Sequence, residues 1–294
     1  GTGITLAADT ILNAGSGAIN INGAVTGDDN SLALNTTGTT TIGAAISGIT
    51  TLTTNAVGTT AINADVSSSG AQTYNDNVTL SGAARTLTST SSGAIFFDGT
   101  IDGTQDLTVA TGGLTTFDGL VGSTTILGAI DISGAGGLDL NAAIANAASL
   151  DVSGATNLGA NVVTTGAQTY TGTATLSTDV TLDSTGDQNT DDISLAAVIG
   201  AGGGTQDLIL DAGALAQITA SGSITNLTDI SIRDSGGATF GSAVTASNDF
   251  IISESAGDII FNGALTAGTF TQTADANTAY NLEFNAGGTI TDAV

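Results

Sequence analysis

Several residue types are missing from this chain of 294 residues. It contains no proline, cysteine, methionine, tryptophan, histidine or lysine, and its only basic residues are Arg85 and Arg233. Without histidine or lysine the chain lacks the base of Ser-His catalysis and the lysine of a phosphate-binding P-loop. Without cysteine it can form neither a disulfide framework nor a thiolate metal site. We therefore expect no enzymatic activity, and the missing cysteine fits an exported protein.

Positive charge is nearly absent as well. The two arginines stand against 27 acidic residues, of which all but Glu254 and Glu283 are aspartates, and the net charge is −25. This charge opposes binding to nucleic-acid phosphates and to an anionic membrane surface. The apolar runs are only a few residues long, too short to span a membrane. We expect no nucleic-acid partner and no membrane insertion.

The residues that are present are those of β-strands. Hydrophobic residues make up 40% of the chain, with 42 glycines, while the helix formers lysine, methionine, glutamate and arginine are nearly missing. Isoleucine, leucine, valine and threonine favour strands, and glycine, asparagine and aspartate interrupt the chain at short intervals. The composition therefore predicts an all-β protein.

A repeat of about 20 residues determines the predicted fold. Leu32 recurs as Leu52 and Ile42 recurs as Ile62. Within each repeat apolar residues alternate with polar ones, which is typical of strands with one buried face. Such a unit buries its apolar face only when copies stack. We predict a right-handed parallel β-helix (β-solenoid) with rungs of about 20 residues, forming one continuous domain over 1–294.

The repeat also predicts which side chains lie above one another inside the solenoid. Residues 20 apart should form two interior columns, one of Leu87, Leu107 and Leu127 and the other of Phe97 and Phe117. Each column would be buried, because its members occupy equivalent inward positions of successive rungs.

Asparagines recur at one position of the early repeats, as Asn13, Asn35 and Asn55. Stacked asparagines form amide ladders when equivalent strands lie in register. We expect such a ladder at one corner of the solenoid, the other interpretation being ordinary turn composition.

A longer repeat overlies the short one. The motif Gly-Ala-Gln-Thr-Tyr at 70–74 returns at 166–170, and Thr-Gln-Asp-Leu at 104–107 returns later with a larger spacing. The second copy has therefore gained residues. We place the gains at 186–192 and 201–204, where insertions in a solenoid would leave as loops.

The segment 107–121 carries a family resemblance. It reads Leu-Thr-Val, then Gly-Gly, then Thr-Thr-Phe-x-Gly-x-Val. Together with the Gly-Ala-Gln-Thr-Tyr units, this pattern resembles the β-strand repeats of filamentous-haemagglutinin-like exoproteins, which are large bacterial adhesins or autotransporter-type passengers. The resemblance covers essentially the whole chain and implies a β-solenoid that serves as a stalk.

These observations predict a structural or adhesive extracellular protein at the bacterial cell surface, either a filament subunit or a stalk segment of a giant adhesin. Its expected partners are copies of itself, joined end to end or laterally, or a covalent continuation of the same repeats. Host or cell-surface glycans stay open as partners. One alternative is a calcium-stabilised surface-layer or matrix protein. A remote alternative is a polysaccharide-active β-helix enzyme, because stacked aspartates such as Asp229 and Asp249 could supply a carboxylate pair.

The insertion at 186–192 is the candidate metal site. Asp187, Asp191 and Asp192 offer the hard oxygen ligands that calcium prefers. The other interpretation is a solvated acidic loop. No cofactor is required by the sequence, and calcium is the one that it leaves open.

Overall fold

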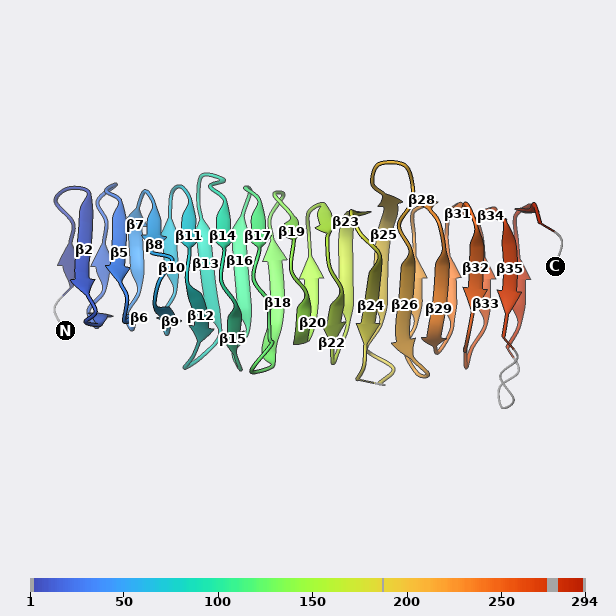
Figure 1. Ribbon diagram of the computed structural model, residues 1–294, viewed down its shortest axis with the longest axis horizontal. Helices are drawn as coiled ribbons and strands as arrows, with labels where there is room; N and C mark the ends of the chain where they lie inside the picture. The colour runs from blue at the N-terminus through green and yellow to red at the C-terminus, as the bar shows by residue number, and fades with distance from the viewer. Residues whose placement is uncertain (1–2, 187, 274–279, 293–294) are drawn as a thin grey trace. The chain divides into compact units, whose positions relative to one another are not determined.

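The computed structural model describes residues 3–186, 188–273 and 280–292, which form 37 β-strands and no helix. The chain divides into two compact units, Gly1–Ala148 and Ser149–Val294. In both, parallel strands of successive turns lie side by side (Figure 1), with about 21 residues to a turn. The prediction of an all-β parallel β-solenoid is confirmed. No helix among the described residues is long and apolar enough to cross a membrane.

Each turn of the first unit contributes strands to three parallel columns. The first column consists of β1 (Ile4–Thr5), β4 (Val25–Thr26), β7 (Ile46–Ile49), β10 (Val66–Ser68), β13 (Arg85–Ser89), β16 (Leu107–Thr111) and β18 (Leu127–Ser133). The second consists of β2 (Thr10–Gly15), β5 (Leu32–Thr36), β8 (Leu52–Thr54), β11 (Gln72–Tyr74), β14 (Ile95–Phe97), β17 (Thr115–Phe117) and β19 (Leu138–Leu140). The third consists of β3 (Ile19–Ile21), β6 (Thr39–Ile42), β9 (Thr59–Ile62), β12 (Asn77–Leu80) and β15 (Ile101–Gly103).

The second unit has the same organisation, except that β23 and β25 each pass through two columns. β20 (Ile144–Val152) contains the boundary between the units. One column continues from it through β23 (Gln168–Leu176), β25 (Ile193–Gly200), β27 (Ile218–Ala220), β30 (Ala238–Phe240), β33 (Ile259–Phe261) and β36 (Leu282–Phe284). Another runs from β21 (Thr156–Leu158) through β23, β25, β28 (Ile224–Leu227), β31 (Val244–Ala246) and β34 (Leu265–Ala267) to β37 (Thr289–Ile290). The third consists of β22 (Val162–Thr164), β24 (Val180–Ser184), β26 (Leu208–Gly213), β29 (Ile230–Ser235), β32 (Asp249–Ile252) and β35 (Thr269–Gln272).

Alternation along each strand builds the interior. In most strands buried and partly exposed residues alternate, and the buried set is largely isoleucine, leucine, valine and phenylalanine. In the first unit Tyr74, Phe97 and Phe117 occupy equivalent positions of successive turns. The rings of Tyr74 and Phe97 are stacked with centroids 5.0 Å apart, and those of Phe97 and Phe117 meet edge to face at 5.5 Å. Phe240 and Phe261 stack likewise in the second unit, at 5.0 Å. The predicted position of Phe97 over Phe117 is thus the observed one.

The predicted leucine column is wrong in register. Leu87, Leu107 and Leu127 are all buried, but Leu87 pairs with Val109 and Leu107 pairs with Ile130. The turns here are two or three residues longer than the 20 assumed. From Leu107 to Val109 the shift is two residues, which keeps every side chain on its own face, so the alternation of apolar residues does not distinguish the two registers. From Leu127 to Ile130 the shift is three residues, and both side chains are buried because the alternation is interrupted at the start of β18.

The predicted asparagine ladder forms only in part. Asn13 pairs with Asn35, and the Asn35 side-chain amide donates a 3.0 Å hydrogen bond to Asn13 Oδ1. Asn55 instead bonds the backbone of the preceding turn. Its Oδ1 accepts from the Thr36 N–H at 2.8 Å, and its Nδ2 donates to the Thr36 carbonyl at 2.9 Å. The side chains of Asn13 and Asn35 are therefore bonded to each other, whereas the side chain of Asn55 bonds the backbone of Thr36 instead.

Corners where turns touch closely require glycine. Gly58 has a φ of 111°, and a Cβ there would lie 2.4 Å from the carbonyl oxygen of Gly38 one turn away. A side chain is excluded at this corner both by the backbone angle and by the neighbouring turn. The segment 201–204 lies in the loop after β25, which extends farther from the strands than the adjacent loops do (Figure 1).

Candidate functional site

Four aspartates of the second unit occupy equivalent corners of successive turns and form what we call the aspartate ladder: Asp179, Asp207, Asp229 and Asp249. Oδ1 of Asp179 accepts a hydrogen bond from the Asp207 N–H at 3.0 Å. Asp207 accepts from the Asp229 N–H at 3.1 Å, and Asp229 from the Asp249 N–H at 2.8 Å. Oδ1 of Asp249 accepts from the hydroxyl of Thr269. Each carboxylate therefore ties one turn to the next.

Strand register and side-chain length position the ladder. Each of these aspartates stands at the start of a strand in the column that contains β24, β26, β29 and β32, or directly before it. Neighbouring turns lie about 4.8 Å apart, a gap that the short side chain of aspartate spans to reach the N–H above. The same arrangement recurs in the first unit, where Asp106 Oδ1 accepts from the Ala129 N–H at 2.9 Å.

Within the ladder, the carboxyl group of Asp207 has a raised pKa. Partial burial raises the pKa of its carboxyl group, and the negative charges of Asp229 and Asp179 raise it further. The hydrogen bond from the Asp229 backbone opposes this rise in pKa. The ladder thus concentrates like charges along one edge, with backbone N–H groups as their main stabilising partners.

The described aspartates of the insertion at 186–192 accept hydrogen bonds from backbone N–H groups. Asp187 lies outside the described residues. Asp191 is only 5% exposed, and its Oδ2 accepts from the Gln188 N–H at 2.8 Å. Oδ1 of Asp192 accepts from the Gln217 N–H at 2.8 Å, again one turn on.

The structure therefore places Asp191 and Asp192 in backbone-capping roles. Within the described parts of the chain, no group of three or more acidic side chains is arranged to hold a metal ion. Calcium binding at Asp187, Asp191 and Asp192 stays a prediction.

Arg233 lies among acidic side chains in a hollow of about 460 Å³ on the second unit. The other lining residues include Asp211, Asp234 and Glu254. The Arg233 guanidinium lies 3.5 Å from a carboxylate oxygen of Asp211. Burial raises the pKa of the nearby Asp183, the charge of Asp211 adds to this rise and that of Arg233 opposes it. The guanidinium therefore offsets part of the repulsion within this acidic group.

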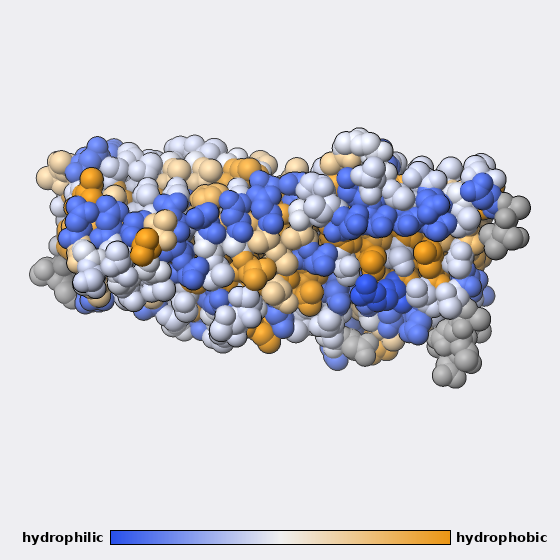
Figure 2. Space-filling view, viewed as in Figure 1, coloured by the Kyte–Doolittle hydropathy of each residue, from blue (hydrophilic) through white to orange (hydrophobic). Residues whose placement is uncertain are grey.

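The face shown in Figure 2 repeats the alternation of the strands. On the visible face, hydrophilic side chains lie in rows with apolar side chains between them (Figure 2). Rows of like residues are the outward counterpart of the interior columns, because in-register stacking places equivalent positions above one another.

A network of hydrogen bonds inside the solenoid was not predicted from the sequence. The Tyr74 hydroxyl donates to Gln72 Oε1 at 2.9 Å, and Gln72 Nε2 donates to the Thr88 carbonyl at 2.8 Å. The second copy repeats the network, with Tyr170 bonded to Gln168 at 3.1 Å.

The repeated Gly-Ala-Gln-Thr-Tyr motif was the signal for this network. Its glutamine and tyrosine are fully buried or nearly so in both copies. The motif therefore encodes a buried cross-connection between columns of strands.

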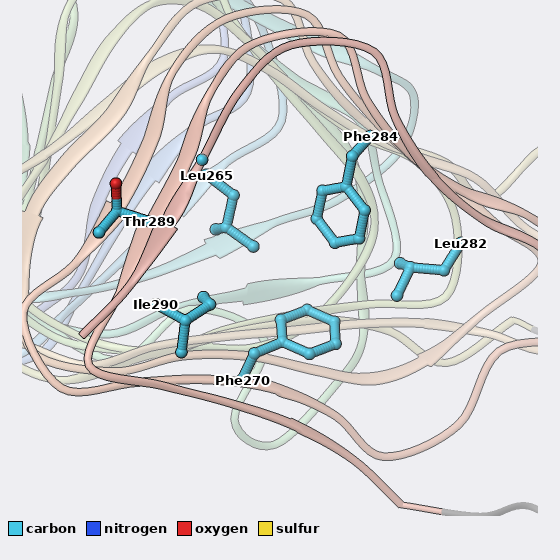
Figure 3. Close-up of a pocket in the computed structure, with 7 residues that line it drawn as sticks. Leu265, Phe270, Leu282, Phe284, Thr289 and Ile290 are labelled. Atoms are coloured by element: carbon cyan, nitrogen blue, oxygen red, sulfur yellow. The ribbon is translucent and has the colours of Figure 1, made fainter. Parts of the chain in front are cut away.

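An apolar hollow of about 360 Å³ lies among β34, β35, β36 and β37. Leu265, Phe270 and Phe284 project into the space that these strands surround (Figure 3). Phe284 is 50% exposed and Ile290 is 44% exposed. Large apolar side chains at such exposure are candidates for an interaction surface.

Comparison with known proteins adds no relative. Searches against protein-family models, curated proteins and solved structures each found no match.

Proposed function

We propose that this chain is a structural, adhesive segment of an extracellular protein, either a filament subunit or a stalk segment of a large bacterial cell-surface adhesin. One observation carries the proposal: in each unit, backbone pairing, interior columns and corner side chains all join a turn to the turns beside it. The carboxylates of the aspartate ladder are bonded to the backbone of the next turn in the same way.

A stack of this kind suits a spacer. Each added turn extends a parallel stack by about 4.8 Å and contacts only its neighbours, so length can grow without a larger core. The negative charges on the surface would keep neighbouring stacks apart in solution.

The hollow among β34–β37 supports pairing with the turns of a second copy of this chain. An incoming strand pair could cover Phe284 and Ile290 while bonding to the backbone of β36 and β37. The burial of a phenylalanine side chain contributes about 1.5–3 kcal/mol, which favours such contact.

Imaging of the native material tests this proposal. Electron microscopy of protein taken from its source, combined with intact mass and with antibody labelling of unbroken cells, should show surface-exposed filaments or stalks that contain the repeat. A protein found only inside the cell, as free monomers, would contradict the proposal.

The chain itself offers a matched comparison. Phe284→Asp places a charge in the apolar hollow and should reduce self-association in analytical ultracentrifugation. Leu215→Asp changes a side chain that is 57% exposed but lies outside the hollow, and should leave association unchanged. Equal effects of the two substitutions would show that the hollow is not the contact surface.

A further inference from the structure

The interior of the first unit contains a small polar group in otherwise apolar surroundings. Thr40 and Thr60 replace aliphatic residues in a column where Ile19 lies one turn before them and Val78 one turn after. Both threonines are fully buried. The hydroxyl of Thr40 has no hydrogen-bond partner. Polar side chains therefore occupy inward positions that aliphatic side chains fill in the neighbouring turns.

Asp76 is the charged member of the group. Its side chain lies at the corner between β11 and β12, yet the residue is only 4% exposed. Its Oδ1 accepts from the Thr54 hydroxyl at 2.9 Å, and the Thr60 hydroxyl lies 2.9 Å from both carboxylate oxygens. Thr54 ends β8 and Thr60 lies in β9, so the carboxyl group connects two strands of the preceding turn across the corner between them.

No compensating charge faces Asp76 from the elements packed around it. On β11 the inward titratable group is Tyr74, whose hydroxyl donates to Gln72, and burial raises its pKa so that it stays neutral. After β14, Asp98 is exposed. On β15, Asp102 accepts bonds from backbone N–H groups at 124 and 125.

The one arginine of the first unit is committed elsewhere. Arg85 Nε donates to the Ser81 carbonyl at 3.2 Å, and its guanidinium lies 3.8 Å from Asp65. Neither β8, β9 nor β12 carries a cation. The two hydroxyls of Thr54 and Thr60 are therefore the side-chain donors that stabilise an ionised Asp76.

We propose that Asp76 is a proton-dependent staple, which holds the corner between β8 and β9 most firmly when its carboxyl group is neutral. A neutral carboxyl group can donate to Thr60 Oγ1 and still accept from Thr54, so both contacts persist without a buried charge. The ionised form keeps the two hydroxyl donors but bears the desolvation cost of a charge inside the solenoid.

The sign of the pH dependence follows from the surroundings. Burial raises the pKa of Asp76 above its ordinary value of 3.8, and the hydroxyls of Thr54 and Thr60 offset only part of the rise. A raised pKa in the folded state means that the stabilisation is complete below the unfolded-state pKa. It is lost as the pH rises through the folded-state pKa. The first unit is thus stapled most firmly below the unfolded-state pKa of this carboxyl group, and less firmly as the pH rises.

Thermal unfolding of the full chain and of Asp76→Asn, between pH 4.5 and 8, tests the proposal. The amide keeps one acceptor and one donor but has no charge. We expect the unfolding midpoint of the parent chain to fall relative to that of Asp76→Asn as the pH rises, by about 2–4 °C or more. Asp98→Asn removes an exposed negative charge directly after Phe97 and should follow the parent profile.

A second measurement follows the protonation of the carboxyl group itself. Carbon-13 NMR of the parent chain, with labelled aspartate, should show the Asp76 carboxyl group titrating above the usual aspartate range, beside the raised signals of Asp183 and Asp207. The Asp76 signal is the one that Asp76→Asn lacks. An Asp76 carboxyl that titrates at or below the usual range would overturn the proposal. So would parent and Asp76→Asn midpoints that stay parallel across the pH range.

Discussion

Aspartate outnumbers glutamate by 25 to two in this chain, and the geometry of the corners accounts for the preference. A carboxylate one methylene from the backbone reaches the N–H of the next turn, as Asp229 reaches Asp249. Glutamate carries an extra rotatable bond, so ordering it in the same contact costs more conformational entropy. The acidic composition is thus partly a consequence of how turns are joined.

Asp229 allows the two contributions of a ladder aspartate to be separated. Asp229→Ala removes the acceptor for the Asp249 N–H and should lower the free energy of unfolding by about 0.5–1.5 kcal/mol. Asp229→Asn keeps an acceptor oxygen and removes repulsion from Asp207, so it should cost less than the alanine variant. Denaturant titration of both variants measures the difference. Equal losses would mean that the charge, rather than the acceptor, holds the corner.

The residue pattern pointed to Asp191 and Asp192 as candidate metal ligands, but it did not predict the hydrogen bonds that their carboxylates accept. Asp191 and Asp192 belong to an acidic loop, and composition does not reveal that their carboxylates bond Gln188 and Gln217. The partner of Asp192 is 25 residues away in sequence. Contacts of this kind depend on the register of turns with unequal lengths, which the sequence leaves undetermined.

At the scale of strands, the alternating pattern correctly predicted which residues are buried, whereas the repeat length of 20 residues did not always predict which residues pair. The period indicated parallel stacking, and the buried face of β16 follows from its alternation. The pairing of Leu87 with Val109 did not follow, because a two-residue shift leaves inward and outward faces unchanged. The aromatic pair Phe97 and Phe117 could be placed because its turn contains 20 residues.

The Gln-Tyr network of β23 should contribute measurably to stability. Tyr170→Phe leaves Gln168 Oε1 without its tyrosine donor inside the solenoid, and should cost about 1–3 kcal/mol in the free energy of unfolding. Gln168→Met should cost more, because it also removes the donor to the Asp183 carbonyl. Tyr74→Phe provides the matched comparison in the first unit and should cost a similar amount. A Tyr170→Phe variant as stable as the parent would show that this network is energetically neutral.

For the molecule as a whole, charge and architecture fit together. A net charge of −25 with two arginines leaves most carboxylates without a cationic partner, and backbone N–H groups take that place at the corners. The hollow around Arg233 and the buried Asp76 are two exceptions. In the first, an arginine offsets the repulsion; in the second, burial favours the neutral acid.

The register of the stack is the central claim, and engineered disulfides test it most directly because the chain has no cysteine of its own. Thr88 pairs with Ala110 in neighbouring turns, at a separation of about 4.8 Å that suits a disulfide. Thr108 is two residues away along the same strand, roughly 8 Å from Thr88, which is too far. We expect Thr88→Cys with Ala110→Cys to form the bond under mild oxidation, and Thr88→Cys with Thr108→Cys to remain reduced. The opposite result would contradict the register described here.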